Sequence, residues 1–187
     1  MPPVFPLDDP ASAFIEAACV PRDAHQFGTL EQAEMILARY PHVALSSIHA
    51  AAVVADEPTV RMFLARDPAS AIMTGGPRGW DALTHLCFSR YLRIDRARSD
   101  GFVSTARALL DAGASASTGW IEMIDHPNPR PVFEPAIYGA AGIAQHPGLK
   151  QLLLERGADP NNEETPYHVA SKRATIRCSK SCLRAAN

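Results

Sequence analysis

Two reactive side chains lie two positions apart near the middle of the chain. His85 and Cys87 are the residue types of a general base and a thiol nucleophile. On one helix, residues two apart point to different sides, so the two side chains would not hydrogen-bond directly. We therefore expect structural roles for both. The alternative is an enzyme or small-molecule binder built around this pair.

No recognised catalytic or metal-binding signature accompanies the pair. The sequence contains no Gly-x-Ser-x-Gly, His-Glu-x-x-His, phosphate loop or dinucleotide fingerprint. Residues 74–79 (TGGPRG) lack the Lys-Ser/Thr of a phosphate loop and predict a hairpin tip. Cys178 and Cys182 have no matching Cys or His pair that would complete a zinc site. We expect no catalytic residue, no cofactor and no metal.

The predicted hairpin tip together with the two residues after it (74–81), which we call the finger, is the first of three candidate binding surfaces. Arg78, Trp80 and Asp81 are the residues selected there. Trp and Arg are the residues most enriched at the energetic centres of protein interfaces. The opposing interpretation is that Trp80 folds down over the next helix and belongs to the core.

The second candidate is the long connection 115–134. Trp120, Ile121 and Met123 lie in it, together with Phe133 and several prolines. Such apolar residues either pin a loop to the core or remain free for a partner. Since proline limits the loop's conformational freedom, binding by it would lose less entropy.

The third candidate is the arginine-rich segment 89–100, from which we select Arg90 and Arg93. Arginines hold acidic peptides or phosphates through charge-assisted hydrogen bonds. Asp95 and Asp100 lie close enough in sequence to neutralise them, and the alternative is a solvated helical extension.

Composition and charge limit the classes of protein to consider. The 187 residues are 47% hydrophobic and 20% charged, which is typical of one globular domain. No run approaches the roughly 18 apolar residues of a membrane span, and the N-terminus lacks a signal-peptide pattern, so we expect a cytoplasmic protein. Residues 171–187 hold five cations and no acid, whereas residues 1–170 hold 13 cations against 20 acids. An acidic body argues against nucleic acid as a partner.

The elements that must position these residues repeat along the chain. Residues 35–41 (MILARYP) return as 62–68 (MFLARDP), and related helix ends occur at 108–114 (ALLDAGA) and 152–159 (LLLERGAD). A helix with a double-Leu stripe and a Gly-Ala stop, used four times, predicts an all-α solenoid whose units bury their apolar faces against neighbours.

The openings of the units carry a family resemblance. Residues 46–52 (SSIHAAA) and 165–170 (TPYHVA) resemble the Thr-Pro-Leu-His-x-Ala opening of ankyrin repeats, with degenerate copies at 81–87 and 135–141. The resemblance implies an ankyrin-like stack of helix-turn-helix repeats with extended inter-repeat loops, in which His49 and His168 form structural hydrogen bonds. The double-Leu ends are 27, 46 and 44 residues apart, against about 33 in an ordinary unit, so the later units carry inserts.

The expected organisation is one ankyrin-repeat domain over residues 1–187. It comprises an N-terminal capping helix at 11–20, repeats over about 29–162 with inserts at 89–100 and 115–134, and a partial repeat with a basic tail at 163–187. We expect a non-enzymatic monomer that binds an unidentified protein through its concave face and loop tips. A truncated fragment of a longer array is a further alternative.

Overall fold

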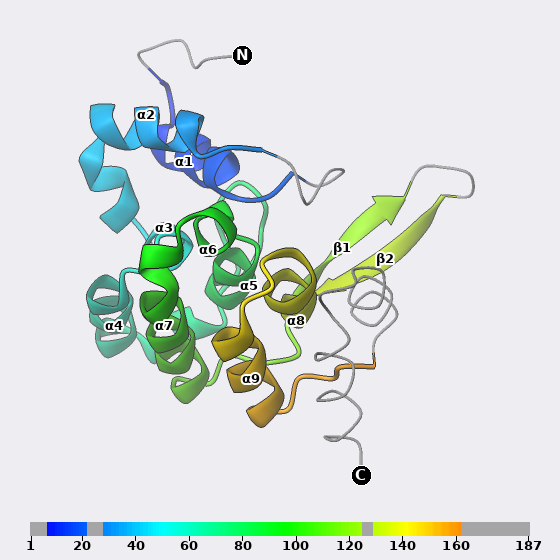
Figure 1. Cartoon of the computed structure of the whole chain (residues 1–187). Coiled ribbons are helices and arrows are strands. Elements are labelled where there is room, and N and C mark those ends of the chain that lie inside the picture. The colour runs from blue at the N-terminus through cyan, green and yellow to red at the C-terminus, as the bar shows by residue number, and fades with distance from the viewer. Residues whose placement is uncertain (1–6, 22–27, 125–128, 162–187) are drawn as a thin grey trace.

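Most of the described chain folds into short helices. The structure is a computed structural model that describes residues 7–21, 28–124 and 129–161. Figure 1 shows a body of helices from which one β-hairpin projects. In chain order the helices are α1 (Pro10–Ala18), α2 (Glu31–Arg39), α3 (Ile48–Val53), α4 (Glu57–Arg66), α5 (Ala82–Cys87), α6 (Arg90–Ile94), α7 (Ser99–Asp111), α8 (Ala136–Tyr138) and α9 (Pro147–Glu155). The 3₁₀ helices are η1 (Pro41–Leu45), η2 (Pro68–Ala71) and η3 (Arg96–Arg98), and η4 (Gly139–Ile143) is a π-helix. The strands are β1 (Gly119–Ile124) and β2 (Arg130–Pro135).

Short polar side chains begin many of these helices. Asp9, Ser47, Asp56 and Asp81 each accept a hydrogen bond from a backbone N–H of the helix that follows. Such N-caps satisfy backbone donors that have no partner within the helix. The turn between α3 and α4 places Ala55 at φ 58°, a left-handed conformation that favours glycine.

The helices pack in two rows. One row contains α1, α3, α5 and α8, each in contact with the next, while α4, α7 and α9 form a second row. Contacts of α3 with α4, of α5 with α7 and of η4 with α9 join the rows into successive pairs (Figure 1). The helices α3, α4, α5 and α7 therefore pack against neighbours both within their own row and across to the other.

Small residues allow the first row to pack closely. A Cβ added at Gly139 would lie 2.6 Å from the backbone oxygen of Cys87, well inside van der Waals contact. Ala51, Ala52 and Ala140 are fully or nearly fully buried in the same row. The small side chains bring backbones together and leave the larger core volume to Leu, Ile and aromatic residues.

The two inserts have regular structure of their own. Residues 89–100 form α6, η3 and the start of α7. Residues 115–134, for which the sequence predicts a proline-stiffened loop in an all-α protein, instead contribute a two-stranded antiparallel sheet. Residues 11–20 lie largely within α1 as expected, and the predicted partial repeat and tail at 163–187, with His168, lie outside the described residues.

Candidate protein-binding site

Trp80 is a core residue, which corrects its predicted place at the surface of the finger. Its side chain is only 5% exposed. Its ring centroid lies 5.0 Å from that of Trp120, 5.3 Å from His85 and 5.6 Å from Phe88. Trp120, 7% exposed, belongs to the same cluster. Because both indoles pack on other rings, neither is available as an anchor for a partner.

Arg78 ties the finger to the N-terminal helix. Its guanidinium donates to a carboxylate oxygen of Glu16 through Nε at 3.0 Å and Nη2 at 2.8 Å, and to the Val20 carbonyl through Nη1 at 2.7 Å. It also lies 4.8 Å from the centroid of the Trp80 ring. Only 4% of the Arg78 side chain is exposed, so it joins the finger to α1 within the protein and does not face a partner.

Asp81 is likewise occupied within the fold. One carboxylate oxygen accepts from the Thr84 backbone N–H at 2.7 Å and caps α5, while the other accepts from the Thr118 hydroxyl. The latter bond joins the start of α5 to the segment that leads into β1.

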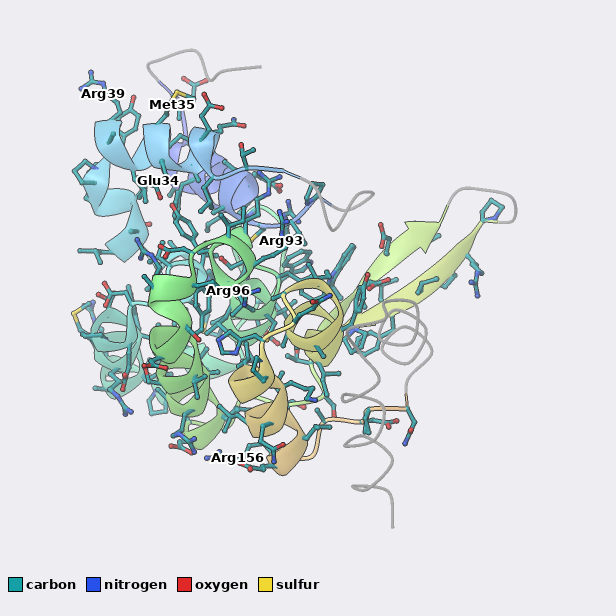
Figure 2. The ribbon with its side chains drawn as sticks, in the orientation of Figure 1. Glu34, Met35, Arg39, Arg93, Arg96 and Arg156 are labelled. Atoms are coloured by element: carbon teal, nitrogen blue, oxygen red, sulfur yellow. The ribbon has the colours of Figure 1, made fainter. Side chains whose placement is uncertain are left out.

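Arg90 and Arg93 hold the segment that leads into α2. Arg90 donates to the carbonyls of Ala17 and Thr29, and Arg93 donates to the carbonyl of Gly28 at 3.0 Å. Figure 2 shows Arg93 between α6 and that segment. Burial lowers the pKa of Arg90, and repulsion from Arg78 lowers it further. Both arginines donate to backbone carbonyls of this protein. The sequence predicts instead that they face outward and bind an acidic peptide or phosphate.

His85 and Cys87 are both buried, and neither is poised for nucleophilic chemistry. Nδ1 of His85 hydrogen-bonds to the Asp81 carbonyl at 2.9 Å, and burial lowers the pKa of His85 to about 3, helped by the charges of His49 and Arg78. Burial, together with the Asp81 charge, raises the pKa of the Cys87 thiol. The imidazole therefore stays neutral and the thiol stays protonated at neutral pH, whereas a nucleophilic cysteine needs a thiolate.

His49 links α3 to the residues just before the finger. Its Nε2 hydrogen-bonds to the Met73 carbonyl at 3.0 Å, and its ring lies 5.3 Å from that of His85. His146 accepts from the Leu149 N–H through Nδ1, so its Nε2 carries the proton that is donated to Ser99 Oγ at 2.7 Å. Within the described residues, no group of three or more His, Cys, Asp or Glu side chains is arranged to hold a metal ion.

The β1–β2 hairpin presents two different faces. In the antiparallel register Ile121 pairs with Phe133 and Met123 pairs with Pro131, so their side chains share one face. On that face Ile121 is 57%, Met123 58% and Phe133 45% exposed. Trp120, Val132 and Glu134 lie on the other face and are buried. We call the exposed set, Ile121, Met123 and Phe133, the outward apolar face.

Gly119 shapes the base of this face. A Cβ added there would lie 2.8 Å from Cζ of Phe133 and 2.3 Å from the Glu134 carbonyl oxygen. The missing side chain lets the Phe133 ring lie over β1, beside Ile121. The outward apolar face is therefore continuous across both strands.

A cleft of about 510 Å³ lies elsewhere, between η1 and the α3–α4 turn, and its polar groups are already used. Its lining residues are Leu37, Pro41, Ala44, Val54, Ala55, Asp56, Pro58 and Arg98. Asp56 caps α4, and Arg98 binds Asp95 and the Val54 carbonyl. The cleft lacks the free, convergent polar groups that fix a small ligand.

The eight residues selected from the sequence thus divide into two groups. Six of them pack or hydrogen-bond within the protein: Arg78, Trp80, Asp81, Arg90, Arg93 and Trp120. The other two, Ile121 and Met123, are largely exposed. Phe133 completes the exposed set. Residues 119–124 (GWIEMI) and 130–135 (RPVFEP) carry no regular apolar–polar alternation, so only the strand register assigns Phe133 to this face. No local signal pairs Arg78 with Glu16, since 62 residues separate them.

Comparison with protein-family models, curated proteins and solved structures finds no match to this chain. In the described part of the chain, no helix is long and apolar enough to span a membrane.

Proposed function

We propose that the protein is a non-enzymatic, cytoplasmic protein-binding module whose paired helices form an ankyrin-like stack and whose binding surface is the outward apolar face of the hairpin. The stack supplies a rigid base for the hairpin. The partner is an unidentified protein, bound by one copy of this chain.

One observation carries this proposal: three large apolar side chains lie exposed on one face of a hairpin whose other face is anchored. Isolated exposed hydrophobic residues are ordinary, but a contiguous apolar patch is typical of interaction sites. The Trp120 ring stacks on Trp80 and holds the base of β1 against the helices. A partner that covers this face would therefore meet a surface that is already ordered, which lowers the entropy lost on binding.

The helical body also supports binding over catalysis. His85 and Cys87, which the enzyme alternative requires, are buried and uncharged, and the cleft on the other side of the body has its polar groups engaged. The small-molecule or enzyme alternative therefore has less support from the described residues. A fragment without independent function would not explain why the exposed apolar residues gather on one anchored face.

The test is capture of partners from a lysate with matched variants. The face variant carries Ile121→Thr, Met123→Thr and Phe133→Thr, since Thr keeps β-propensity while removing apolar area. The control variant carries Met62→Gln, Ile72→Thr and Met73→Gln, three equally exposed apolar residues outside the hairpin. We expect a protein retained by wild type and control but lost by the face variant, with all three folded by circular dichroism. Equal retention by all three would contradict the proposal.

A further inference from the structure

The hydrogen-bonding pattern of the hairpin shows which backbone groups point outward. The Ala136 N–H donates to the Thr118 carbonyl at 2.7 Å, in register with the strand pairs. Because bonded and non-bonded pairs alternate in an antiparallel ladder, Gly119, Ile121 and Met123 occupy non-bonded positions. Their N–H and C=O groups point away from β2, and none of them bonds to backbone elsewhere in the described residues.

The outer edge of β2 is different because proline occupies it. The three β2 residues at non-bonded positions are Pro131, Phe133 and Pro135. Proline has no N–H, so this edge offers one outward donor where β1 offers three. Proline on an edge is a common way to prevent pairing with another strand. The hairpin thus has one open edge and one blocked edge.

The outward apolar face borders the open edge directly. Ile121 and Met123 belong to the open strand itself, and Phe133 lies opposite Ile121 on the neighbouring strand. A strand added beside β1 would place alternate side chains next to Ile121 and Met123 on the same face. Backbone pairing and apolar contact would then be satisfied together.

We propose that the open edge of β1 binds an extended segment of the partner protein by strand addition. The proposal rests on the proposed function and specifies its partner: a segment of about five residues, with apolar side chains at alternate positions facing the outward apolar face and without proline at positions facing β1. Main-chain hydrogen bonds provide the affinity in this mode, and alternate side chains provide the specificity.

The small size of the edge favours a peptide segment over a second copy of the chain. Three outward residues of β1 and three exposed side chains form the site, whereas a stable protein pair buries about 1,200–2,000 Å² in total. A short strand needs less area, because it is held by backbone bonds and is flexible enough to follow the twisted edge.

The experiment separates edge from face at a single residue. Met123→Thr removes the apolar side chain and keeps the outward N–H, whereas Met123→Pro removes both. Phe133→Pro is the matched control, because it removes an apolar side chain and an N–H from the edge that is already blocked. The probe is a fluorescent eight-residue peptide of alternating Thr and Val with Lys at each end, titrated by fluorescence anisotropy.

We expect Met123→Pro to weaken peptide binding about tenfold more than Met123→Thr, and Phe133→Pro to weaken it no more than Phe133→Thr. Hydrogen exchange at the Ile121 and Met123 amides should slow when peptide is added, with the Phe133 amide unchanged. Unfolding midpoints in urea check that each variant keeps the fold.

Other results would overturn the proposal in distinguishable ways. Equal weakening by Thr and Pro at position 123 would reject strand addition and leave the apolar face as the binding surface. Peptide binding unaffected by either change would reject both. Failure of wild type to bind the peptide, or a concentration-dependent dimer that Met123→Pro abolishes, would reject a partner strand, while the lysate experiment would still test the proposed function.

Discussion

The finger around Trp80 and the hairpin around Ile121 carry similar sequence signals. The finger buries its tryptophan and arginine, whereas the hairpin exposes Ile121 and Met123. Both follow a helix pair, and both carry a tryptophan and exposed-looking polar or proline residues. In the finger, Trp80 and Arg78 turn inward. In the hairpin, Trp120 turns inward while Ile121, one residue later, turns outward.

The difference shows that residue type alone does not place a side chain at an interface. Trp80 finds three rings within stacking distance, and Arg78 finds Glu16 and a carbonyl. Ile121 has no such choice, because strand alternation directs every second residue away from the anchored face. Neighbours settle the first case, and backbone geometry settles the second.

The largest expected effect comes from removing the ring at the centre of the finger. Trp80→Ala should lower the free energy of unfolding by about 3–5 kcal/mol, because it opens a cavity among Trp120, Phe88 and His85. Urea denaturation measures the change. A variant as stable as wild type would place Trp80 outside the core and restore its role as a surface anchor.

Acid should lower the free energy of unfolding through His85, whose ring packs against Trp80. The pKa of His85 lies at about 3 in the folded protein because of burial, against about 6.5 in the unfolded chain. The unfolded state therefore binds the extra proton below pH 6.5, and His85 alone lowers the free energy of unfolding by about 2 kcal/mol between pH 8 and pH 5.

Urea midpoints over this pH range for wild type and His85→Leu provide the measurement. His85→Leu should flatten the slope, leaving the contribution of His146, whose pKa burial also lowers. An unchanged slope in His85→Leu would mean that this imidazole binds protons in the folded protein as readily as in the unfolded chain.

A smaller effect is expected at the link between finger and N-terminal helix. Glu16→Gln should cost about 1–2 kcal/mol, because it leaves the buried Arg78 charge without its carboxylate, while Glu16 itself is partly exposed. Glu57→Gln is the matched control, since it breaks an exposed pair with Arg61 and should cost under about 0.5 kcal/mol. Equal losses in the two variants would show that Arg78 is solvated.

The smallest effect on stability is expected at the outward apolar face. Ile121→Thr should change the free energy of unfolding by no more than about 0.5 kcal/mol, because the side chain is mostly in solvent. Thermal unfolding by circular dichroism measures it. A loss as large as that of Trp80→Ala would mean that the hairpin face supports the fold, and the contrast between the two regions would disappear.

Local signals in the sequence identify helix ends well. Gly113 and Gly157 follow helices at φ 105° and 91°, as expected of glycine just past a helix end. Pro58 and Pro147 lie in the first turn of α4 and α9, where a missing N–H costs little. These features depend on neighbours within a few residues, and the sequence contains that information.

The hairpin and the finger depend on residues that are distant in sequence. Pro127, Pro129 and Pro131 predict a loop at 115–134, yet Pro131, like Pro135 after it, occupies a position whose nitrogen needs no partner within the sheet. Only the register reveals that. Similarly, Arg78, which the sequence predicts at the surface, is buried beside Glu16. This pairing exists only once the helices have assembled.

The unequal edges of the hairpin limit how many strands it can recruit. With β1 open and β2 closed by proline, a sheet that grows from this hairpin gains one strand on one side and none on the other. Each molecule is therefore monovalent as a template: it ends a chain of strand pairings and does not propagate one. A hairpin of this kind can therefore expose apolar side chains for a partner without forming fibres. Two copies joined edge to edge would form a closed pair.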